Sequence, residues 1–392
     1  MALDRAKLSR EFAVRFSGEP RLFRAPGRVN LIGEHTDYND GFVLPVAIDR
    51  EVMFAVRART DRKVRLAALD VAPQTVFECD LDEPVRTTSA HHWSSYVKAM
   101  ARALEGEGVR CTGFEGVVAG DVPIGGGVSS SSAFTAAVAT LFERLNSLRL
   151  PPKRMVELIL DAENLATGLR GGIMDQYTAR LGKAGAALLI DCRVKEHVEV
   201  ELPEMTIVVA DTRRPRTLAA TAYNERRAQC ELAARAVATR HENVRALRDV
   251  TPSMLEDCRD LLSRDVYRRA RHVVTETERT LASVELLRAG DLVRFGRLVT
   301  QSHQSLRDDY EVSCEELDVL AEIAWTVPGV YGARMVGAGF GGCIIALCGA
   351  ETVAPLTTAL RREYVRRCGR ETDVYATVAS DGASEVTEGA EA

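Results

Sequence analysis

The chain has 392 residues, an apolar fraction of 46% and a formal net charge of −5. This length and composition predict a folded enzyme of roughly two or three domains, and the mixture of charges argues against a nucleic-acid surface. Nine cysteines without a CxxC pair argue against a zinc site and a disulfide framework. Because no apolar run reaches the roughly 18 residues that span a bilayer, we expect a cytoplasmic protein with free thiols and no membrane contact.

Strand patterns dominate the first part of the chain. Apolar residues from Phe42 to Ala58 indicate strands that are interrupted at Pro45 and at Asp49 and Arg50. The next expected elements are a strand around Val64 and Leu66, a helix over 93–104 and a strand over 116–119. Together they predict a sheet near the N-terminus that is covered by at least one helix.

A glycine- and serine-rich loop follows the strand over 116–119 and leads into an amphipathic helix predicted over 131–147. Glycines let backbone amides converge, and the N-terminus of a helix favours an anion, so the loop predicts a polyphosphate site. It is not a Walker A loop, because no Gly-Lys-Ser/Thr follows. The alternative is a flexible loop with a serine as N-cap. The residues that carry the polyphosphate interpretation are Gly125, Gly126, Gly127, Ser129, Ser130 and Ser131.

The second half is predicted to be mainly helical. Pro151 and Pro152 open a helix that carries Glu163 near its end. Three glycines between 337 and 342 match G-x-G-x-x-G, but a β-branched run follows them, which predicts a strand and argues against a dinucleotide site. The alternative for these glycines is a turn between strands. Other expected elements are strands over 186–190, 207–210 and 344–347, helices over 217–324, and a disordered acidic tail over 381–392.

A polar segment near the N-terminus, residues 27–41, has the composition of a binding pocket. It contains three glycines together with Arg28, Glu34, His35 and Asp37. Carboxylate and imidazole groups can hold neighbouring hydroxyls by directional hydrogen bonds, and glycines allow close approach of the backbone, so a sugar is the expected ligand. A metal site of His35, Asp37 and Asp40 is less favoured, because no second histidine lies nearby.

These three segments together resemble the galactokinase signature within the galactose, homoserine, mevalonate and phosphomevalonate kinase superfamily. The resemblance extends from about Pro26 to about Leu347, through residues 172–176 and 223–227. It implies an α/β (α+β) small-molecule kinase fold of two domains, with the active site in the cleft between them. The expected domains are a ribosomal-protein-S5-like domain over 1–195 and an α/β sandwich domain over 196–380. We expect the enzyme to be a monomer.

The resemblance also implies roles for individual residues. Asp175 would act as the base on the anomeric hydroxyl of the sugar, and Arg28 would stabilise the transition state and the deprotonated acid. A Mg²⁺ ion would be held by Ser130 and Glu163, although Ser129 or Ser131 could take the serine position. Galactose would contact Glu34, His35, Asp37 and Tyr223, and ATP would bind the glycine and serine loop. Judged by local sequence alone, Asp175 would be a helix cap or turn former, Arg28 a surface ion-pair partner, Glu163 a surface acid and Tyr223 a core residue.

The implied function is ATP-dependent phosphorylation of the C1 hydroxyl of α-D-galactose to α-D-galactose 1-phosphate and ADP, the first phosphorylated step of galactose catabolism. One alternative is a kinase of N-acetylgalactosamine or arabinose. Another is a silent galactose and ATP sensor, whose serine loop would be shorter than the one over 125–133. Mevalonate and homoserine kinases lack the pocket over 34–38. Small departures from the family pattern include Gly171, where cysteine is frequent, and Ala338, which matters only if the backbone there needs a positive φ.

Overall fold

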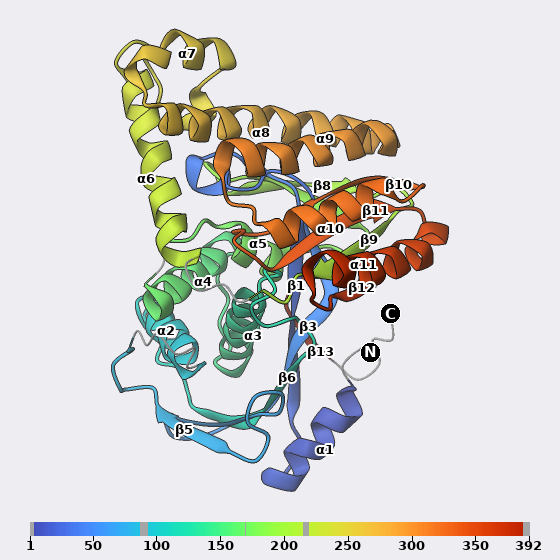
Figure 1. Ribbon diagram of the computed structural model, residues 1–392. Coiled ribbons are helices and arrows are strands. Elements are labelled where there is room, and N and C mark those ends of the chain that lie inside the picture. The colour runs from blue at the N-terminus through green and yellow to red at the C-terminus, as the bar shows by residue number, and fades with distance from the viewer. Residues whose placement is uncertain (1–3, 87–92, 169, 215–218, 387–392) are drawn as a thin grey trace.

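The computed structural model describes residues 4–86, 93–168, 170–214 and 219–386. Within these ranges the strands form sheets of six, four and three strands. Figure 1 shows the six-stranded sheet and its helices at one end of the molecule and a layer of long helices at the other. No helix in the described part of the chain is both long enough and apolar enough to cross a bilayer.

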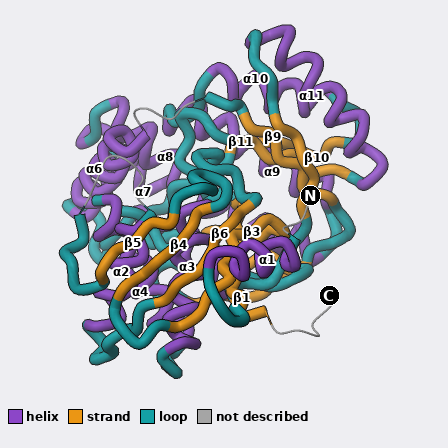
Figure 2. The backbone as a smooth tube through the Cα atoms, turned by 90° about the horizontal axis from the view of Figure 1, so that it is seen from below, coloured by secondary structure: helices purple, strands orange, loops and turns teal. Residues whose placement is uncertain are grey.

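The six-stranded sheet has the order β13-β1-β3-β6-β4-β5. Its strands are β1 (Arg21–Asn30), β3 (Pro45–Ala58), β4 (Lys63–Ala68), β5 (Val76–Asp80), β6 (Phe114–Gly120) and β13 (Ser384–Val386). Figure 2 shows helix α1 (Arg5–Arg15) on one face of this sheet and helices α2 (Ser94–Glu105), α3 (Ser130–Leu145) and α4 (Pro152–Thr167) on the other. Both faces are therefore covered.

Strand β3 shows why the sheet is buried on both sides. Phe54 and Val56 pack in the same cluster as α3, whereas Met53 and Ala55 pack against α1. Successive side chains of a strand point to opposite faces, so the part of β3 between the two helical layers, residues 52–56, is apolar at every position. The interruption predicted at Asp49 and Arg50 is wrong, because β3 is continuous. The side chains of Asp49 and Arg50 find their partners on β12 (Asp373–Thr377). Asp49 accepts a hydrogen bond from Thr377, and the guanidinium group of Arg50 lies over the ring of Tyr375.

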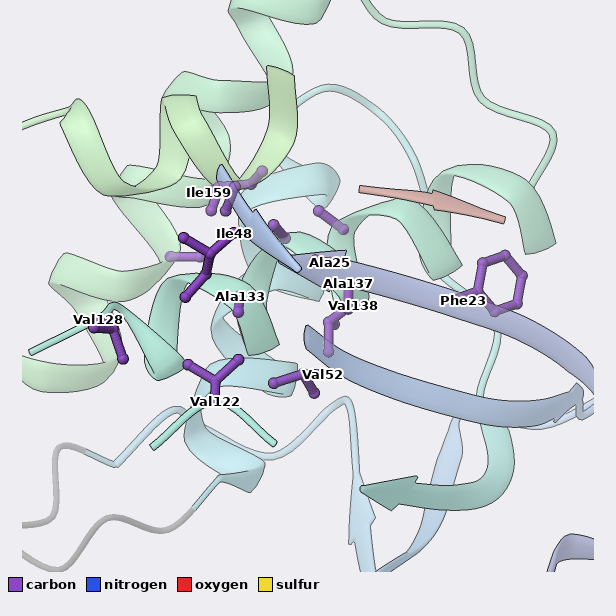
Figure 3. Packing of buried hydrophobic residues seen from close by; sticks show 14 of the residues in the cluster. Phe23, Ala25, Ile48, Val52, Val122, Val128, Ala133, Ala137, Val138 and Ile159 are labelled. Carbon is purple, nitrogen blue, oxygen red and sulfur yellow. The ribbon is translucent and has the colours of Figure 1, made fainter. Parts of the chain in front are cut away.

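Small side chains let α3 lie close to this sheet. Ala133 and Ala137 are fully buried, and Figure 3 shows them beside Ala25 and Val52 of the sheet. The loop before α3 is anchored in the same core by Val122 and Val128, both labelled in Figure 3. This packing sets the N-terminus of α3 next to the end of β1, and it brings the glycine and serine loop to the polar segment over 27–41.

The four-stranded sheet has the order β10-β11-β9-β12, and the three-stranded sheet has the order β2-β7-β8. Their remaining strands are β2 (Phe42–Val43), β7 (Ala186–Asp191), β8 (Glu196–Glu201), β9 (Thr206–Asp211), β10 (Val330–Met335) and β11 (Cys343–Cys348). The remaining helices are α5 (Met174–Leu181), α6 (Ala219–Ala238), α7 (Pro252–Asp257), α8 (Arg264–Arg288), α9 (Leu292–Ser305), α10 (Glu315–Thr326) and α11 (Val353–Cys368). Short helical turns are η1 (Asp37–Asn39), η2 (Leu247–Asp249), η3 (Arg259–Leu261), the π-helix η4 (Leu306–Tyr310) and η5 (Ala350–Thr352).

The mixed α and β fold expected from the resemblance is confirmed, as are most of the elements read from the sequence. The glycine turn over 337–342 leads into β11 and not into a helix, as predicted from its β-branched residues. The mainly helical half is confirmed from Ala219 onwards, and residues 217–218 lie outside the described residues. The division expected at residue 195 falls in the turn of the β7–β8 hairpin, and we keep it as a proposal.

The tail departs from the expectation of disorder. Residues 381–386 are ordered: Gly382 N donates to Gly182 O (2.8 Å), Ala383 N donates to Ala179 O (2.9 Å), and β13 pairs with β1. Composition predicts disorder here, but an edge strand offers unpaired backbone groups that even a short polar segment can use. Residues 387–392 of the predicted tail lie outside the described residues.

Candidate functional site

The loop between β6 and α3 has the geometry expected of an anion site. Gly125 and Gly127 have φ values of 78° and 81°, which favour glycine. The loop leads directly into the first turn of α3, where amide groups lack partners within the helix. Ser129 occupies the N-cap position of this helix, as the alternative expected, but its side chain makes no capping hydrogen bond. Its Oγ donates instead to Asp175 Oδ2, at 2.5 Å.

Arg28 and Asp175 form the centre of the site. Arg28 Nε donates to Asp175 Oδ1 (2.8 Å) and Nη2 donates to Oδ2 (3.0 Å), a bidentate pair. The third guanidinium nitrogen, Nη1, donates to the carbonyl oxygen of Gly127 at 2.6 Å. Arg28 is buried, which excludes the surface ion pair, whereas the Asp175 side chain remains 30% exposed. Strand β1, the glycine and serine loop and helix α5 therefore meet at one reachable carboxylate.

Glu34 joins the polar segment over 27–41 to the glycine turn over 337–342. Its Oε1 accepts a hydrogen bond from Gly337 N (2.6 Å) and lies 3.2 Å from Arg334 Nη2, while its Oε2 accepts from Asn30 Nδ2 (3.0 Å). Gly337 has a φ of 80°, and a Cβ there would lie 2.9 Å from the Gly127 carbonyl. The glycine turn over 337–342 therefore packs beside the glycine and serine loop, as the resemblance implies. Ala338 is not among the residues with positive φ, so it meets no strain.

His35, Asp37 and Tyr223 form a cluster near Asp175. The His35 ring lies 5.7 Å from that of Tyr223, and its Nε2 is buried without a hydrogen-bond partner. Burial lowers the pKa of His35 to about 3, and the nearby His272 lowers it further. Burial raises the pKa of Asp37 to about 7, and the charge of Asp175 adds to this. Among the described residues, His35, Asp37 and Asp40 do not converge on a common metal position.

The Glu163 carboxylate lies behind the start of α3. Its Oε2 accepts hydrogen bonds from Gln176 Nε2 (2.8 Å) and Ser132 Oγ (3.1 Å). Its Oε1 and the amide oxygen of Gln176 are both buried without a partner. Ser132 is thus the serine in contact with Glu163, while Ser130 is half-buried in the first position of α3. Ser130 as a metal ligand stays a prediction. Burial raises the pKa of Glu163 to about 7, and an unpartnered carboxylate oxygen suits a cation that prefers oxygen.

Sequence reasoning did not single out several residues that shape this site. Arg334 is fully buried beside Glu34, and Glu276 of α8 accepts a hydrogen bond from Gly33 N at 2.9 Å. Tyr38 belongs to the pocket already predicted over 34–38, and its hydroxyl contacts His35 Nδ1 (2.8 Å) and the hydroxyl of Tyr310 (2.7 Å), a residue that was not predicted. Arg334 lies just before the glycine turn over 337–342, and this position in the sequence could have marked it as a residue of the site. Nothing in the local sequence marks Glu276 or Tyr310.

A glycine and serine loop at a helix N-terminus, beside a buried arginine that holds a partly exposed aspartate, is a geometry that suits a kinase acting on a small molecule. Family models agree with this class: "GHMP kinases N terminal domain" matches residues 95–183 and "GHMP kinases C terminal" matches residues 283–366. A third model, "Galactokinase galactose-binding signature", matches residues 10–58 and so covers the polar segment.

Comparison with whole proteins identifies the family within this class of small-molecule kinases. The galactokinase of Roseiflexus sp. (strain RS-1) is 44% identical over 390 residues, which cover 99% of both chains. The crystal structure of Lactococcus lactis galactokinase complexed with galactose matches with a TM-score of 0.91 and 37% identity, over 97% of this chain and 98% of that one. The mevalonate kinase of Methanococcus jannaschii has a TM-score of 0.66 at 18% identity, over 93% and 100% of the two chains, and shares the fold alone. The chain belongs to the galactokinase family and is a kinase.

Proposed function

We propose that this enzyme transfers the γ-phosphoryl group of ATP to the C1 hydroxyl of α-D-galactose, giving α-D-galactose 1-phosphate and ADP, the first phosphorylated step of galactose catabolism. The observation that carries the proposal is the pair Arg28 and Asp175, which touches the phosphate loop at Gly127 and faces the sugar segment at Asp37. The galactose bound to the Lactococcus lactis relative supports the choice of sugar.

In this proposal Asp175 is the base. Its carboxylate accepts the proton of the C1 hydroxyl as the oxygen forms a bond to the γ-phosphorus and the bond to the bridging oxygen of ADP breaks. Arg28 holds the carboxylate at a defined position and also presents positive charge beside the loop that binds the phosphates. The phosphates bind to the backbone of Gly125, Gly126 and Gly127 and to Ser129, Ser130 and Ser131.

The sugar hydroxyls are assigned to Glu34, His35, Asp37 and Tyr223. The Glu34 carboxylate accepts two hydrogen bonds within the protein and forms an ion pair with Arg334, which leaves some of its roughly four acceptor positions for a ligand. His35 contributes the unpartnered Nε2, and a buried nitrogen without a partner costs free energy that a sugar hydroxyl would recover. These contacts explain why a hydroxyl-rich substrate suits this site.

A Mg²⁺ ion is part of the proposal. The unpartnered oxygens of Glu163 and Gln176 fit a hard cation, and Ser130 or a neighbouring serine would complete its protein ligands. Bound to the nucleotide, the ion would neutralise charge on the phosphate oxygens. Glu163 would hold the ion at the start of α3. A monomeric enzyme in the cytoplasm completes the proposal, and light scattering of the purified protein tests the oligomeric state.

A coupled assay of ADP release with several sugars tests the function. We expect galactose to give the highest kcat/KM, with N-acetylgalactosamine, arabinose and mevalonate far below it, and phosphorus NMR to place the ester on C1. ADP release that is as fast with arabinose or N-acetylgalactosamine would favour the kinase alternatives. Galactose binding without any ADP release would instead show a silent sensor.

A further inference from the structure

A chain of hydrogen bonds runs from the sugar pocket into the C-terminal half of the protein. His35 Nδ1 lies 2.8 Å from the Tyr38 hydroxyl, which lies 2.7 Å from the Tyr310 hydroxyl. The Tyr310 hydroxyl lies 3.1 Å from the sulfur of Cys230 on α6. Tyr310 and Cys230 are fully buried, so solvent does not compete for these groups.

Tyr310 is held firmly where the π-helix η4 ends. Arg226 Nε donates to the Tyr310 carbonyl oxygen at 2.8 Å, and Glu311 turns the chain away with a φ of 53°. The Tyr310 ring contacts two imidazoles, with centroids 4.8 Å from His35 and 4.6 Å from His272. A π-helical turn is uncommon and is often found at functional sites. Here it presents one hydroxyl to the tyrosine that contacts His35.

The chemistry of the four groups determines the direction of the hydrogen bonds. A neutral imidazole has one N–H group and one acceptor nitrogen, and a thiol is both a weak donor and a weak acceptor. If Cys230 donates to Tyr310, both phenols donate to strong acceptors, namely the Tyr38 oxygen and the basic nitrogen of His35. In the reverse direction His35 Nδ1–H would donate to Tyr38, Tyr38 would donate to Tyr310, and the Tyr310 hydroxyl would donate to the sulfur of Cys230, which is a weak acceptor. The first direction is therefore favoured.

We propose that Tyr310 is a positioning residue for the sugar: acting through Tyr38, it keeps Nδ1 of His35 unprotonated, so that Nε2–H donates to a sugar oxygen. Nε2 of His35 is buried without a hydrogen-bond partner in the geometric sense. Burial has the larger effect on the pKa of His35 and lowers it, while the backbone of Ala338 also acts on the ring and raises it. The pocket therefore recognises an acceptor oxygen at this position, and Asp37 and Glu34 are left to accept from sugar hydroxyls. The inference rests on the proposed function for the identity of the ligand, but the protonation state of His35 is independent of it.

Nitrogen NMR of the ligand-free protein tests the inference directly. The chain has seven histidines, and in a sample with ¹⁵N-labelled histidine the protonated and unprotonated ring nitrogens have well separated shifts. The spectrum of His35→Gln identifies the His35 signals. We expect wild type to show Nε2 protonated and Nδ1 free, and Tyr38→Phe and Tyr310→Phe to show a mixture of both tautomers.

Steady-state kinetics provide a second test of the proposal. Loss of one uncharged hydrogen bond is expected to raise the KM for galactose about three- to ten-fold in Tyr310→Phe, with kcat and the KM for ATP nearly unchanged. Tyr364→Phe is the matched control, because Tyr364 is also fully buried and donates to the carbonyl oxygen of Thr212 (2.9 Å), outside the site. Its KM for galactose and its His35 signals should match wild type.

The outcomes separate the two proposals. Protonated Nδ1 in wild type, or an unchanged tautomer in Tyr310→Phe, would overturn the inference whatever the kinetics. A rise in KM of the same size in Tyr364→Phe would also overturn it, because the effect would then reflect general loosening. If wild type shows the expected tautomer but does not phosphorylate galactose, the proposed function fails and the hydrogen-bond chain stands.

Discussion

A side chain at position 172 would occupy the space of the Asp37 carboxylate. A Cβ built on Gly172 would lie 1.7 Å from Asp37 Oδ2, and Gly172 is not among the glycines with positive φ. Glycine is therefore needed here for space and not for backbone conformation. The neighbouring Gly171 has room, since its nearest neighbour would be the Asn164 side-chain oxygen at 3.7 Å.

We expect Gly172→Ala to raise the KM for galactose by at least about ten-fold, because Asp37 must move out of the pocket. A ten-fold change corresponds to about 1.4 kcal/mol, a modest cost for displacing one charged contact. Gly171→Ala is the matched control and should retain the wild-type KM. Equal KM values for the two variants in the ADP-release assay would contradict the argument that Gly172 leaves space for the Asp37 carboxylate.

Arg28 should matter at least as much as the base. General-base catalysis supplies about 10²–10⁴-fold, whereas a cation at the transferring phosphoryl group supplies about 10³–10⁵-fold. We therefore expect Arg28→Ala to lose at least as much kcat as Asp175→Asn. Arg21→Ala is the control on the same strand, because Arg21 is 44% exposed and pairs with Glu385 at the surface. Turnover of Arg28→Ala close to that of wild type would refute the ranking.

The raised pKa of Glu163, about 7, predicts a pH-dependent need for metal. Only the ionised carboxylate binds Mg²⁺ well, so protonation competes with the ion as the pH falls through this value. Between pH 8 and pH 6 the ionised fraction falls about ten-fold, and the Mg²⁺ concentration for half-maximal rate should rise by a similar factor. In Glu163→Gln this shift should disappear while the requirement for Mg²⁺ rises at every pH. An unchanged requirement at both pH values would argue against Glu163 as a ligand.

At the scale of elements, the segment after Ser380 illustrates how pairing overrides composition. Strand β13 extends the sheet at β1, the strand that carries Arg28, and Glu385 accepts two hydrogen bonds from Arg21, at 2.7 and 2.9 Å. The backbone of Gly382 approaches α5 so closely that a Cβ would lie 2.4 Å from the Arg180 carbonyl. The segment therefore joins β1 to the helix that carries Asp175.

We expect removal of residues 381–392 to lower the melting temperature by several degrees, because the edge of β1 loses its partner strand and the end of α5 loses two backbone hydrogen bonds. Removal of residues 387–392 alone is the control, and its acidic, small composition predicts little change. Differential scanning calorimetry compares the two truncations. Equal melting temperatures would mean that β13 contributes nothing to stability.

Elements with a strong local signal were predicted well. The helix α4 begins at Pro152 as expected from proline in its first turn, and α3 begins at Ser130, within the serine run. The prediction failed at Asp49 and Arg50 and at residues 381–386, where partners distant in sequence decide the structure. In both places polar residues indicated a break, and contacts with β12 or β1 supplied the missing hydrogen bonds.

At the scale of the whole molecule, the two halves meet in a shared core and in a buried ion pair. One hydrophobic cluster contains Phe23 and Leu347, residues from both ends of the chain. Arg334 of β10 is fully buried beside Glu34, and its Nη1 donates to the Asn30 carbonyl oxygen at 3.1 Å. This arginine therefore joins the sheet of the C-terminal half to the polar segment of the N-terminal half.

We expect Arg334→Met to lower the free energy of unfolding by about 3–5 kcal/mol, because the Glu34 carboxylate would lose the cation beside it in a buried setting. The double variant Glu34→Gln/Arg334→Met should recover part of this loss, since it also removes the Glu34 charge that Arg334→Met leaves without its cation. Arg213→Met, which breaks an exposed pair with Asp373, is the control and should change little. Urea unfolding measures all three. A loss in Arg334→Met no greater than in Arg213→Met would contradict the argument.

Local patterns along the chain were enough to predict the kind of site: glycines and serines before a helix predict a phosphate loop, and the polar segment over 27–41 predicts a pocket for hydroxyls. These signals are local, because helix starts and glycine turns depend on neighbouring residues. The family resemblance already implied that Arg28 acts on Asp175. Their bidentate hydrogen bonds, the contact of Ser132 with Glu163, and the path from Tyr310 through Tyr38 to His35 emerged from the folded structure. Such contacts depend on how sheets and helices pack, and residues brought together in this way share no pattern along the chain.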